Sequence, residues 1–178
     1  MEIIHVLMAE HRMIERMVRL MKKELGGLEL SSKANPEFIY SAVDFFTNYA
    51  DTTHHGKEEG ILFKALEGKP LTPNHRAAMG QLVREHGIAR EEVKGLHEAA
   101  QRYERGDLDA IAHISSHLKR LVELYPPHIS LEDREFFPGS MGYLTPEERK
   151  RMLEEAQSYD AGMAHRKYVD IVVRYEGQ

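Results

Sequence analysis

The sequence contains no cysteine, which excludes disulfides, thiolate zinc sites, iron–sulfur clusters and a cysteine nucleophile. It also lacks any apolar stretch of about 18 residues, the length that a membrane-spanning helix requires. Basic residues number 24 and acidic residues 29, so there is no excess of positive charge to bind a nucleic-acid backbone. We therefore expect a cytoplasmic protein that binds neither nucleic acid nor membranes; its oligomeric state stays open.

Strand patterns are missing as well, because no alternation of polar and apolar residues lies between the glycine and proline breakers. The breakers divide the chain into five segments. Predicted ends lie at Gly26-Gly27, Gly68-Lys69-Pro70, Gly106-Asp107 and Pro138-Gly139. Predicted starts, each a capping residue followed by proline, lie at Asn35-Pro36, Thr72-Pro73 and Thr145-Pro146.

Within each segment the apolar residues recur at alternating steps of three and four, as in Ile4, Leu7, His11, Ile14 and Val18. This spacing is typical of helices that face a shared core. The predicted fold is all-α: an up-down-up-down four-helix bundle over about residues 1–138, with an additional C-terminal helix over about 146–175. Proline at 126 and 127 predicts a kink in the fourth helix. We expect one domain spanning residues 1–178.

The sequence is rich in histidine, with eleven residues, and histidine interrupts the apolar spacing of all four bundle helices. The interrupting residues are His11, His54 with Glu58, His86, and His128 with Glu132. Burying several ionisable groups with no ion among them would cost several kcal/mol each. A metal ion in the bundle core is therefore a better interpretation than a set of core histidines.

These six residues are predicted to share one layer. With a rise of about 1.5 Å per residue, their positions along antiparallel helices fall within a depth of roughly 12 Å. His54-x-x-x-Glu58-Glu59 is echoed by His128-x-x-x-Glu132-Asp133, and this spacing puts histidine and carboxylate on one helix face. Two facing carboxylates can bridge two ions, and imidazole with carboxylate suits iron, manganese or zinc. The residues therefore predict a dinuclear site.

The sequence resembles the hemerythrin-like, or HHE cation-binding, family. The matching stretches are Glu10-His11, HHGKEEGILF from residue 54, Glu85-His86, and HISLEDREFFP from residue 128. The resemblance implies a four-helix bundle that holds two non-haem iron ions. It further implies that glutamates bridge the ions, that histidines fill terminal positions, and that one coordination position stays open for O2, peroxide or another small ligand.

Carried over residue by residue, the resemblance gives His11, His54, Glu58, His86, His128 and Glu132 as metal ligands. The oxygen-carrying members have a second histidine on the third helix, where this sequence has Arg90. We predict His55 as the fifth histidine, because it adjoins His54; His165 on the C-terminal helix is the alternative. Asp133 is the alternative to Glu132 as the carboxylate of the fourth helix.

Three functions fit these residues. The first is a di-iron protein that binds O2 or a similar ligand for sensing, storage or delivery. The second is a di-iron enzyme that acts on peroxide or nitric oxide, or in the repair of iron centres. The third is an iron store or iron sensor. The first is the predicted function and the other two are alternatives to it; whether the protein is an enzyme is left open.

Overall fold

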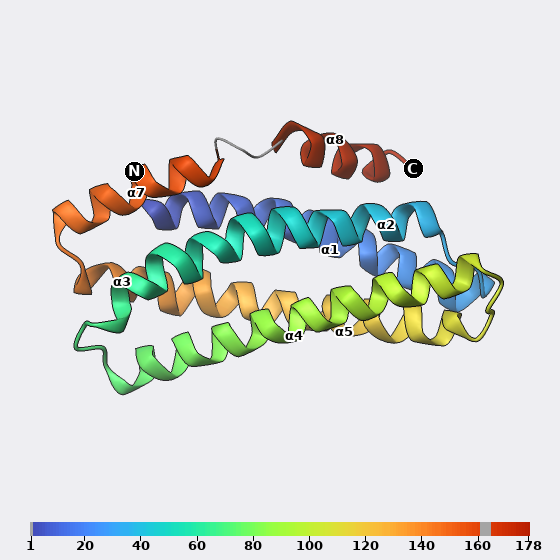
Figure 1. Cartoon of the computed structure of the whole chain (residues 1–178), viewed down its shortest axis with the longest axis horizontal. Coiled ribbons are helices and arrows are strands. Elements are labelled where there is room, and N and C mark those ends of the chain that lie inside the picture. Colours follow the sequence, from blue (N-terminus) through green and yellow to red (C-terminus); the bar gives the residue numbers. More distant parts are fainter. Residues whose placement is uncertain (1, 161–164) are drawn as a thin grey trace.

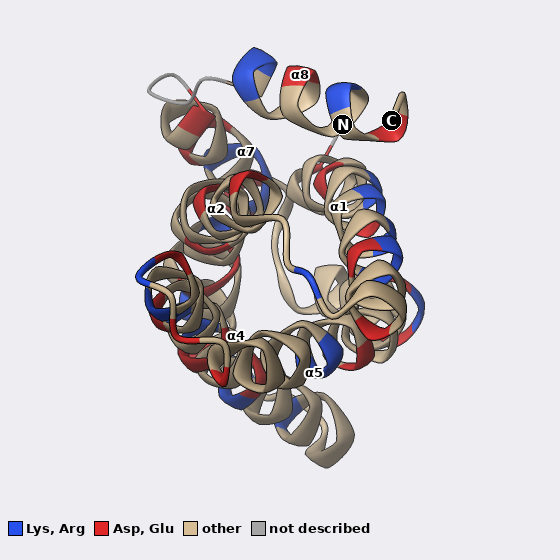
Figure 2. Ribbon diagram, turned by 90° about the vertical axis from the view of Figure 1, so that its right-hand side faces the viewer, with Lys and Arg blue, Asp and Glu red and all other residues tan. Residues whose placement is uncertain are grey.

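A computed structural model of the chain describes residues 2–160 and 165–178. In these two ranges every regular element is a helix and no strand occurs. Four long helical stretches lie lengthwise beside one another and surround a shared core (Figures 1 and 2). The prediction of an all-α bundle is confirmed.

The first long stretch is α1 (Ile3–Ser31) and the third is α4 (Pro73–Glu104). The second stretch combines α2 (Pro36–Asp44), η1 (Phe45–His55), η2 (Glu58–Phe63) and α3 (Lys64–Glu67). The fourth combines α5 (Ala110–Leu131), η3 (Glu132–Phe136), α6 (Phe137–Ser140) and η4 (Met141–Tyr143). Two further helices, α7 (Pro146–Asp160) and α8 (His165–Glu176), follow the bundle.

Three of these elements, η1, η2 and η3, are π-helices, in which the backbone hydrogen bonds span five residues. They lie only in the second and fourth stretches of the described chain, at the two predicted histidine–glutamate motifs. Because a π turn holds more residues than an α-helical turn, successive side chains are rotated by a smaller angle from one another than in an α-helix. This feature was not predicted from the sequence.

The predicted helix starts are confirmed by their caps. The side chain of Asn35 accepts a hydrogen bond from the backbone N–H of Phe38, and the side chain of Thr72 accepts one from that of His75. Thr145 and Glu148 form a reciprocal capping box at the start of α7.

Two predicted helix ends are wrong. α1 continues through Gly26-Gly27 to Ser31 and ends at Ser32, whose φ of 53° is left-handed. The buried Leu28 holds this extension against the core. The fourth stretch continues through Pro138-Gly139 to Tyr143, because proline is tolerated in the first turn of α6. α5 also runs through both Pro126 and Pro127.

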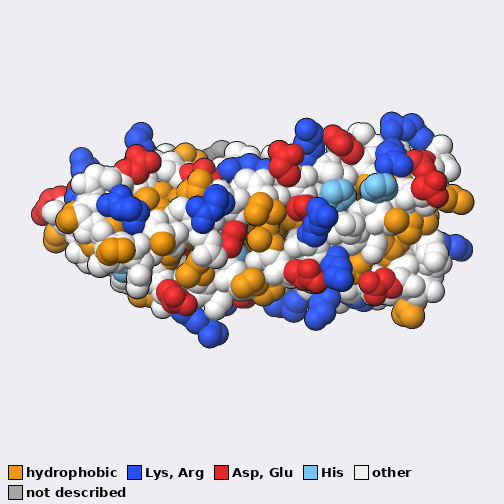
Figure 3. Space-filling view, turned by 90° about the horizontal axis from the view of Figure 1, so that it is seen from below, with side chains coloured by type: hydrophobic (Ala, Val, Ile, Leu, Met, Phe, Trp, Pro, Cys, Tyr) orange, Lys and Arg blue, Asp and Glu red, His pale blue; other side chains and the backbone are white. Residues whose placement is uncertain are grey.

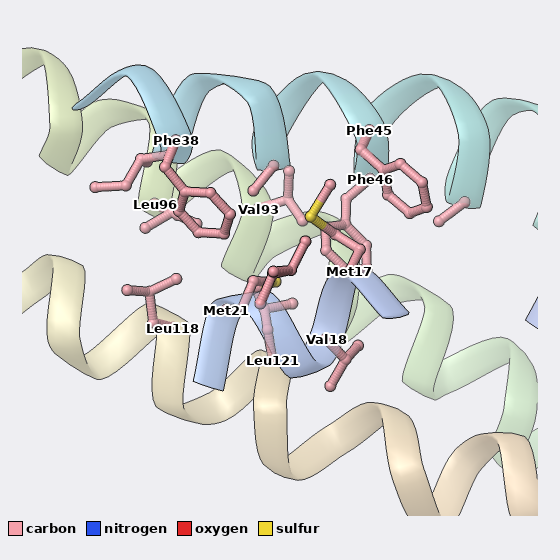
Figure 4. Packing of buried hydrophobic residues seen from close by; sticks show 14 of the residues in the cluster. Met17, Val18, Met21, Phe38, Phe45, Phe46, Val93, Leu96, Leu118 and Leu121 are labelled. Carbon is pink, nitrogen blue, oxygen red and sulfur yellow. The ribbon is translucent and has the colours of Figure 1, made fainter. Parts of the chain in front are cut away.

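The buried apolar residues form two clusters. One, shown in Figure 4, contains Met17, Met21, Phe46 and Leu118 together with neighbours from all four long stretches. The other lies nearer the chain's N-terminus and contains Leu7, Leu62 and Phe136. Along the first three long stretches, the histidines and glutamates of the predicted site lie between these two clusters. In the fourth stretch His128 comes just before Ile129 of the first cluster, and Glu132 lies between the clusters.

The C-terminal helices pack on the outside of the bundle, against α1 (Figures 1 and 2). α7 also contacts η2, and its Tyr159 lies over Gly60 of η2 and over Gly56 just after η1. A Cβ atom at Gly60 would lie only 2.8 Å from the Tyr159 hydroxyl, so these two glycines create room for the tyrosine ring.

In the C-terminal helix, the sequence spacing predicts a face formed by Ala161, His165, Val169 and Val172. Ala161 lies outside the described residues, as do the other residues of 161–164. Val172 is buried, but His165 and Val169 are about two-fifths exposed. Tyr168 and Tyr175 form the buried face with Val172 instead.

The surface mixes both signs of charge. Figure 3 shows Lys and Arg side chains interleaved with Asp and Glu and with scattered hydrophobic side chains. Of the helices that the structure describes, none is long and apolar enough to cross a membrane.

The first prediction concerns α4, where the His117 ring lies directly against Gly95 and hydrogen-bonds Glu92 at 2.6 Å. Alanine normally stabilises a helix interior by about 1 kcal/mol relative to glycine. In Gly95→Ala the new methyl group would displace the imidazole and break its bond to Glu92. We expect a net loss of about 1 kcal/mol in the free energy of unfolding, measured by denaturant titration.

The matched control is Gly26→Ala in α1, where a Cβ atom would meet nothing within 4 Å. This variant should gain up to about 1 kcal/mol. Equal gains in both variants would contradict the close packing of His117 on Gly95.

Candidate metal centre

The layer between the two apolar clusters contains five histidines and two glutamates, none more than 4% exposed. α1 contributes His11 and α4 contributes His86. The second stretch contributes His54, His55 and Glu58, and the fourth contributes His128 and Glu132. These are the seven residues that the sequence predicted, and the structure brings them together.

The seven residues form two groups. Within each group, the atoms that could bind a metal all lie within 4.8 Å of one another. One group is His11, His54, Glu58 and Glu132; the other is His55, His86 and His128.

Each glutamate reaches both groups. Glu58 Oε1 lies 3.2 Å from His54 Nε2, and its Oε2 lies 3.3 Å from His86 Nε2. Glu132 Oε2 lies 3.1 Å from His11 Nε2 and 3.3 Å from His128 Nε2. The two carboxylates therefore lie where they could bridge two ions.

Most of the inward-facing atoms lack a hydrogen-bond partner within the described residues. They are Nε2 of His11, His86 and His128, and both carboxylate oxygens of Glu58 and Glu132. Buried polar groups normally have partners, and leaving them unpaired is costly. Nitrogen and oxygen donors that converge without a partner are a good fit for metal cations.

The outward Nδ1 atom of every one of these histidines contacts a carboxylate. On η1, His54 contacts Glu10 at 3.0 Å, and His55 contacts Asp51 at 3.2 Å. The remaining pairs are His11–Asp133 at 2.7 Å, His86–Glu59 at 2.8 Å and His128–Glu85 at 2.7 Å. A carboxylate that accepts the Nδ1 proton fixes the ring and leaves Nε2 free to bind a metal.

Four of these contacts form a closed ring around the bundle. Glu10 of α1 contacts the second stretch, whose Glu59 contacts α4. Glu85 of α4 contacts the fourth stretch, whose Asp133 contacts α1. Each long stretch thus supports a histidine of the next one.

A further layer of donors holds these carboxylates. Lys57, which is fully buried, donates to Glu10 and also to Asp160 of α7. Arg12 donates to Asp133, and Gln81 donates to Glu85 at 2.8 Å. The carboxylates are therefore held in place independently of the imidazoles.

Arg90, which replaces the second histidine of the third helix, belongs to this layer. It donates to Asp51 and to Glu59, in each case at 2.7 Å. It therefore supports the partners of both His55 and His86.

His55 and His165 lie in different surroundings. The π-helical turn lets His55 follow His54 into the layer, where its ring stacks on that of His86 at 3.8 Å. His165 lies with Glu10 and Asp160, 3.4 Å from Asp160, and its side chain is 41% exposed. Glu132 faces the layer, whereas Asp133 contacts the far side of the His11 ring.

Charge interactions shift the pKa values of the layer strongly. Burial alone would lower the pKa of His54, but Glu58 and Glu10 outweigh it and raise the pKa to about 10. His86 is raised to about 11, because Glu132, Glu58 and Glu59 likewise outweigh its burial. Burial and the neighbouring His86 lower the pKa of His55 to about 3. Without metal, these raised pKa values favour protonated His54 and His86 beside the buried Glu58 and Glu132.

Tyr125 of α5 borders the layer, with its ring 6.3 Å from that of His128. It is 3% exposed, and burial raises its pKa well above the usual range, so it remains a neutral phenol. Its hydroxyl makes no hydrogen bond within the parts of the chain that are described.

Comparison with known families bears directly on this arrangement. The model of the Hemerythrin HHE cation binding domain matches residues 2–139. The chain belongs to this family. No match was found among curated proteins or among solved structures.

The hemerythrin match covers the first three long stretches, the fourth as far as residue 139 and the whole layer, whereas α7 and α8 follow it. Sequence reasoning missed the carboxylates that contact Nδ1 of the histidines. Only the contact between Asp51 and His55 carried a local signal, because these residues are four apart on one helix. The others join different helices and depend on how each helix is rotated.

The second prediction concerns pH. Between about pH 6.5, the usual pKa of histidine, and pH 10, the folded metal-free hemerythrin domain keeps a proton on His54 that the unfolded chain loses. Its free energy of unfolding should therefore fall as pH rises through this window. Denaturant titrations of metal-free protein across the window measure this, and a rise in stability would contradict the protonated site.

The third prediction concerns the outer carboxylates. Glu85→Ala removes the acceptor of the Nδ1 proton of His128, so metal affinity should fall about tenfold or more. Competition with a chelator of known affinity measures the change. Glu91→Ala, an exposed site on the same helix, is the matched control and should bind metal normally. Equal affinities of both variants would show that Glu85 does not support His128.

Proposed function

We propose that this hemerythrin domain holds two iron ions and binds O2 or a similar small ligand, for sensing, storage or delivery. In this proposal His11 and His54 bind one ion, and His55, His86 and His128 bind the other. Glu58 and Glu132 bridge the two. The observation that carries the proposal is the convergence of buried nitrogen and oxygen atoms without partners.

The donor set supports iron. It contains imidazole and carboxylate but no sulfur, a combination that suits iron, manganese and zinc. Membership of a cation-binding family whose members typically bind iron favours iron among these metals. Bound iron would supply the ability to exchange electrons with oxygen.

The unequal groups indicate where a ligand would bind. His11 and His54 would give their ion one histidine fewer than the other group would give, so a small ligand would have room at that ion. The outer carboxylates hold each imidazole in a fixed orientation. The two apolar clusters limit the access of water to the layer.

A di-iron enzyme is the second candidate, and one observation favours it. A cavity of about 740 Å³ reaches His55 and Tyr125, which is more room than a diatomic ligand needs. In that case the neutral Tyr125 phenol would serve as a hydrogen-bond donor beside the centre.

The fourth prediction tests the metal content and the function together. Metal-free protein loaded anaerobically with ferrous iron should hold about two irons per chain, counted by elemental analysis. Exposure to air should produce a visible absorption band that disappears when oxygen is removed. An irreversible band would favour the enzyme or the iron store, and one iron or none would contradict the dinuclear site.

Variants sharpen this experiment. Glu58→Ala should lose both irons together, because the proposed bridge serves both ions. His165→Ala is the control on a histidine near the layer, and it should keep both irons and the band. Loss of a single iron in Glu58→Ala would show that Glu58 does not bridge.

A further inference from the structure

A cavity of about 740 Å³ lies between the second stretch and α4, and at one end it reaches the layer of histidines and glutamates, where His55 lines it. On one side it is bordered by α2 and η1 from Tyr40 to His55, and on the other by α4 from Ala89 to His97. These two helical walls run lengthwise, so the cavity is elongated along the bundle. Its volume is typical of sites for small organic molecules.

The walls of the cavity are mainly apolar. Val43 and Phe46 line it from the second stretch, and Ala89 and Val93 line it from α4. Phe46, Ala89 and Val93 also belong to the buried core, so this surface is fixed by packing. A ligand that fills this length needs an apolar body.

The end nearest the histidine layer is polar. Tyr125 lines it there together with His55, and the Tyr125 side chain is almost completely buried. Its hydroxyl makes no hydrogen bond to any described residue. A ligand with an oxygen acceptor at this end would satisfy the phenol.

Among the residues that the structure describes, the charged side chains around the cavity include one cation without an ion pair. Arg90 is neutralised by Asp51 and Glu59. Asp44 is paired with Lys167 at 2.6 Å. Lys94 has no ion pair among the residues that the structure describes. Helical side chains lean toward the preceding turn, which for Lys94 is the turn of Arg90, near the polar end.

We propose that this cavity binds an organic monocarboxylate with an unbranched apolar tail. The carboxylate accepts a hydrogen bond from the Tyr125 hydroxyl and is neutralised by Lys94. The tail lies along Val43, Phe46 and Val93. This site is additional to the proposed metal function and does not depend on it, because none of its contacts to the ligand uses a metal ion.

The test is isothermal titration of decanoate into anaerobic iron-loaded protein, with the iron content of each sample measured separately. We expect saturable binding of one decanoate per chain. Decanol, which has the same tail without the charge, should bind at least tenfold more weakly. No saturable binding, or equal binding of decanol, would overturn the proposal, whatever the iron content shows.

Three variants identify the contacts. Tyr125→Phe keeps the ring but removes the hydroxyl, and should weaken decanoate binding about tenfold. Lys94→Met should weaken it about threefold, whereas Lys119→Met on the exposed face of α5 is the matched control. Val43→Trp should fill the tail region and abolish binding. Unchanged affinity in both Tyr125→Phe and Lys94→Met would overturn the assignment of the carboxylate.

Because Tyr125 is buried, thermal unfolding of each variant accompanies the titration. Tyr125→Phe keeps its packing against Phe46, where the ring centroids lie 4.9 Å apart, so it should unfold near the wild-type temperature. Weaker decanoate binding with unchanged unfolding and iron content supports the proposed site. If the preference for decanoate over decanol is smaller in Lys94→Met than in the wild type, this would support the charge contact as well.

Discussion

The structure depends on the contact between a buried imidazole and a carboxylate. Seven ionisable side chains lie in a layer between two apolar clusters, where an isolated charge would be very costly. Two sets of contacts offset this cost. The inward Nε2 and carboxylate oxygen atoms converge on a common space. The outward Nδ1 atoms contact the carboxylates of Glu10, Glu59, Glu85, Asp133 and Asp51. Because four of these contacts close a ring through all four long stretches, the same bonds that orient the histidines also fix how the helices are rotated against one another.

The sequence predicts a large part of this arrangement. His11 and His86 stand out because each occupies a position where the helical spacing calls for an apolar side chain. Glu58 and Glu132 stand out because their spacing from a histidine repeats in two helices. Caps such as Asn35 and Thr72 predict the helix starts because they act locally.

What the sequence does not predict depends on distant parts of the chain. Gly26 and Gly27 look like a helix end, yet the burial of Leu28 holds α1 together beyond them. The π-helical turns lie where the second and fourth stretches border the layer, and no local sequence signal predicts them. Their wider turn explains why adjacent histidines, His54 and His55, both enter the layer, and why Arg90 is free to support carboxylates instead.

The outer layer of carboxylates also has an electrostatic consequence. Together with Glu58 and Glu132, the carboxylates that contact imidazoles outnumber the cations that hold them, which are Lys57, Arg12 and Arg90. A histidine must be neutral to bind a metal, so the histidines would not offset this surplus of negative charge. The surplus would therefore act on any ion that the layer binds. Such a field stabilises a trivalent ion more than a divalent one. If the layer holds iron, as proposed, the field would therefore lower the reduction potential of that iron.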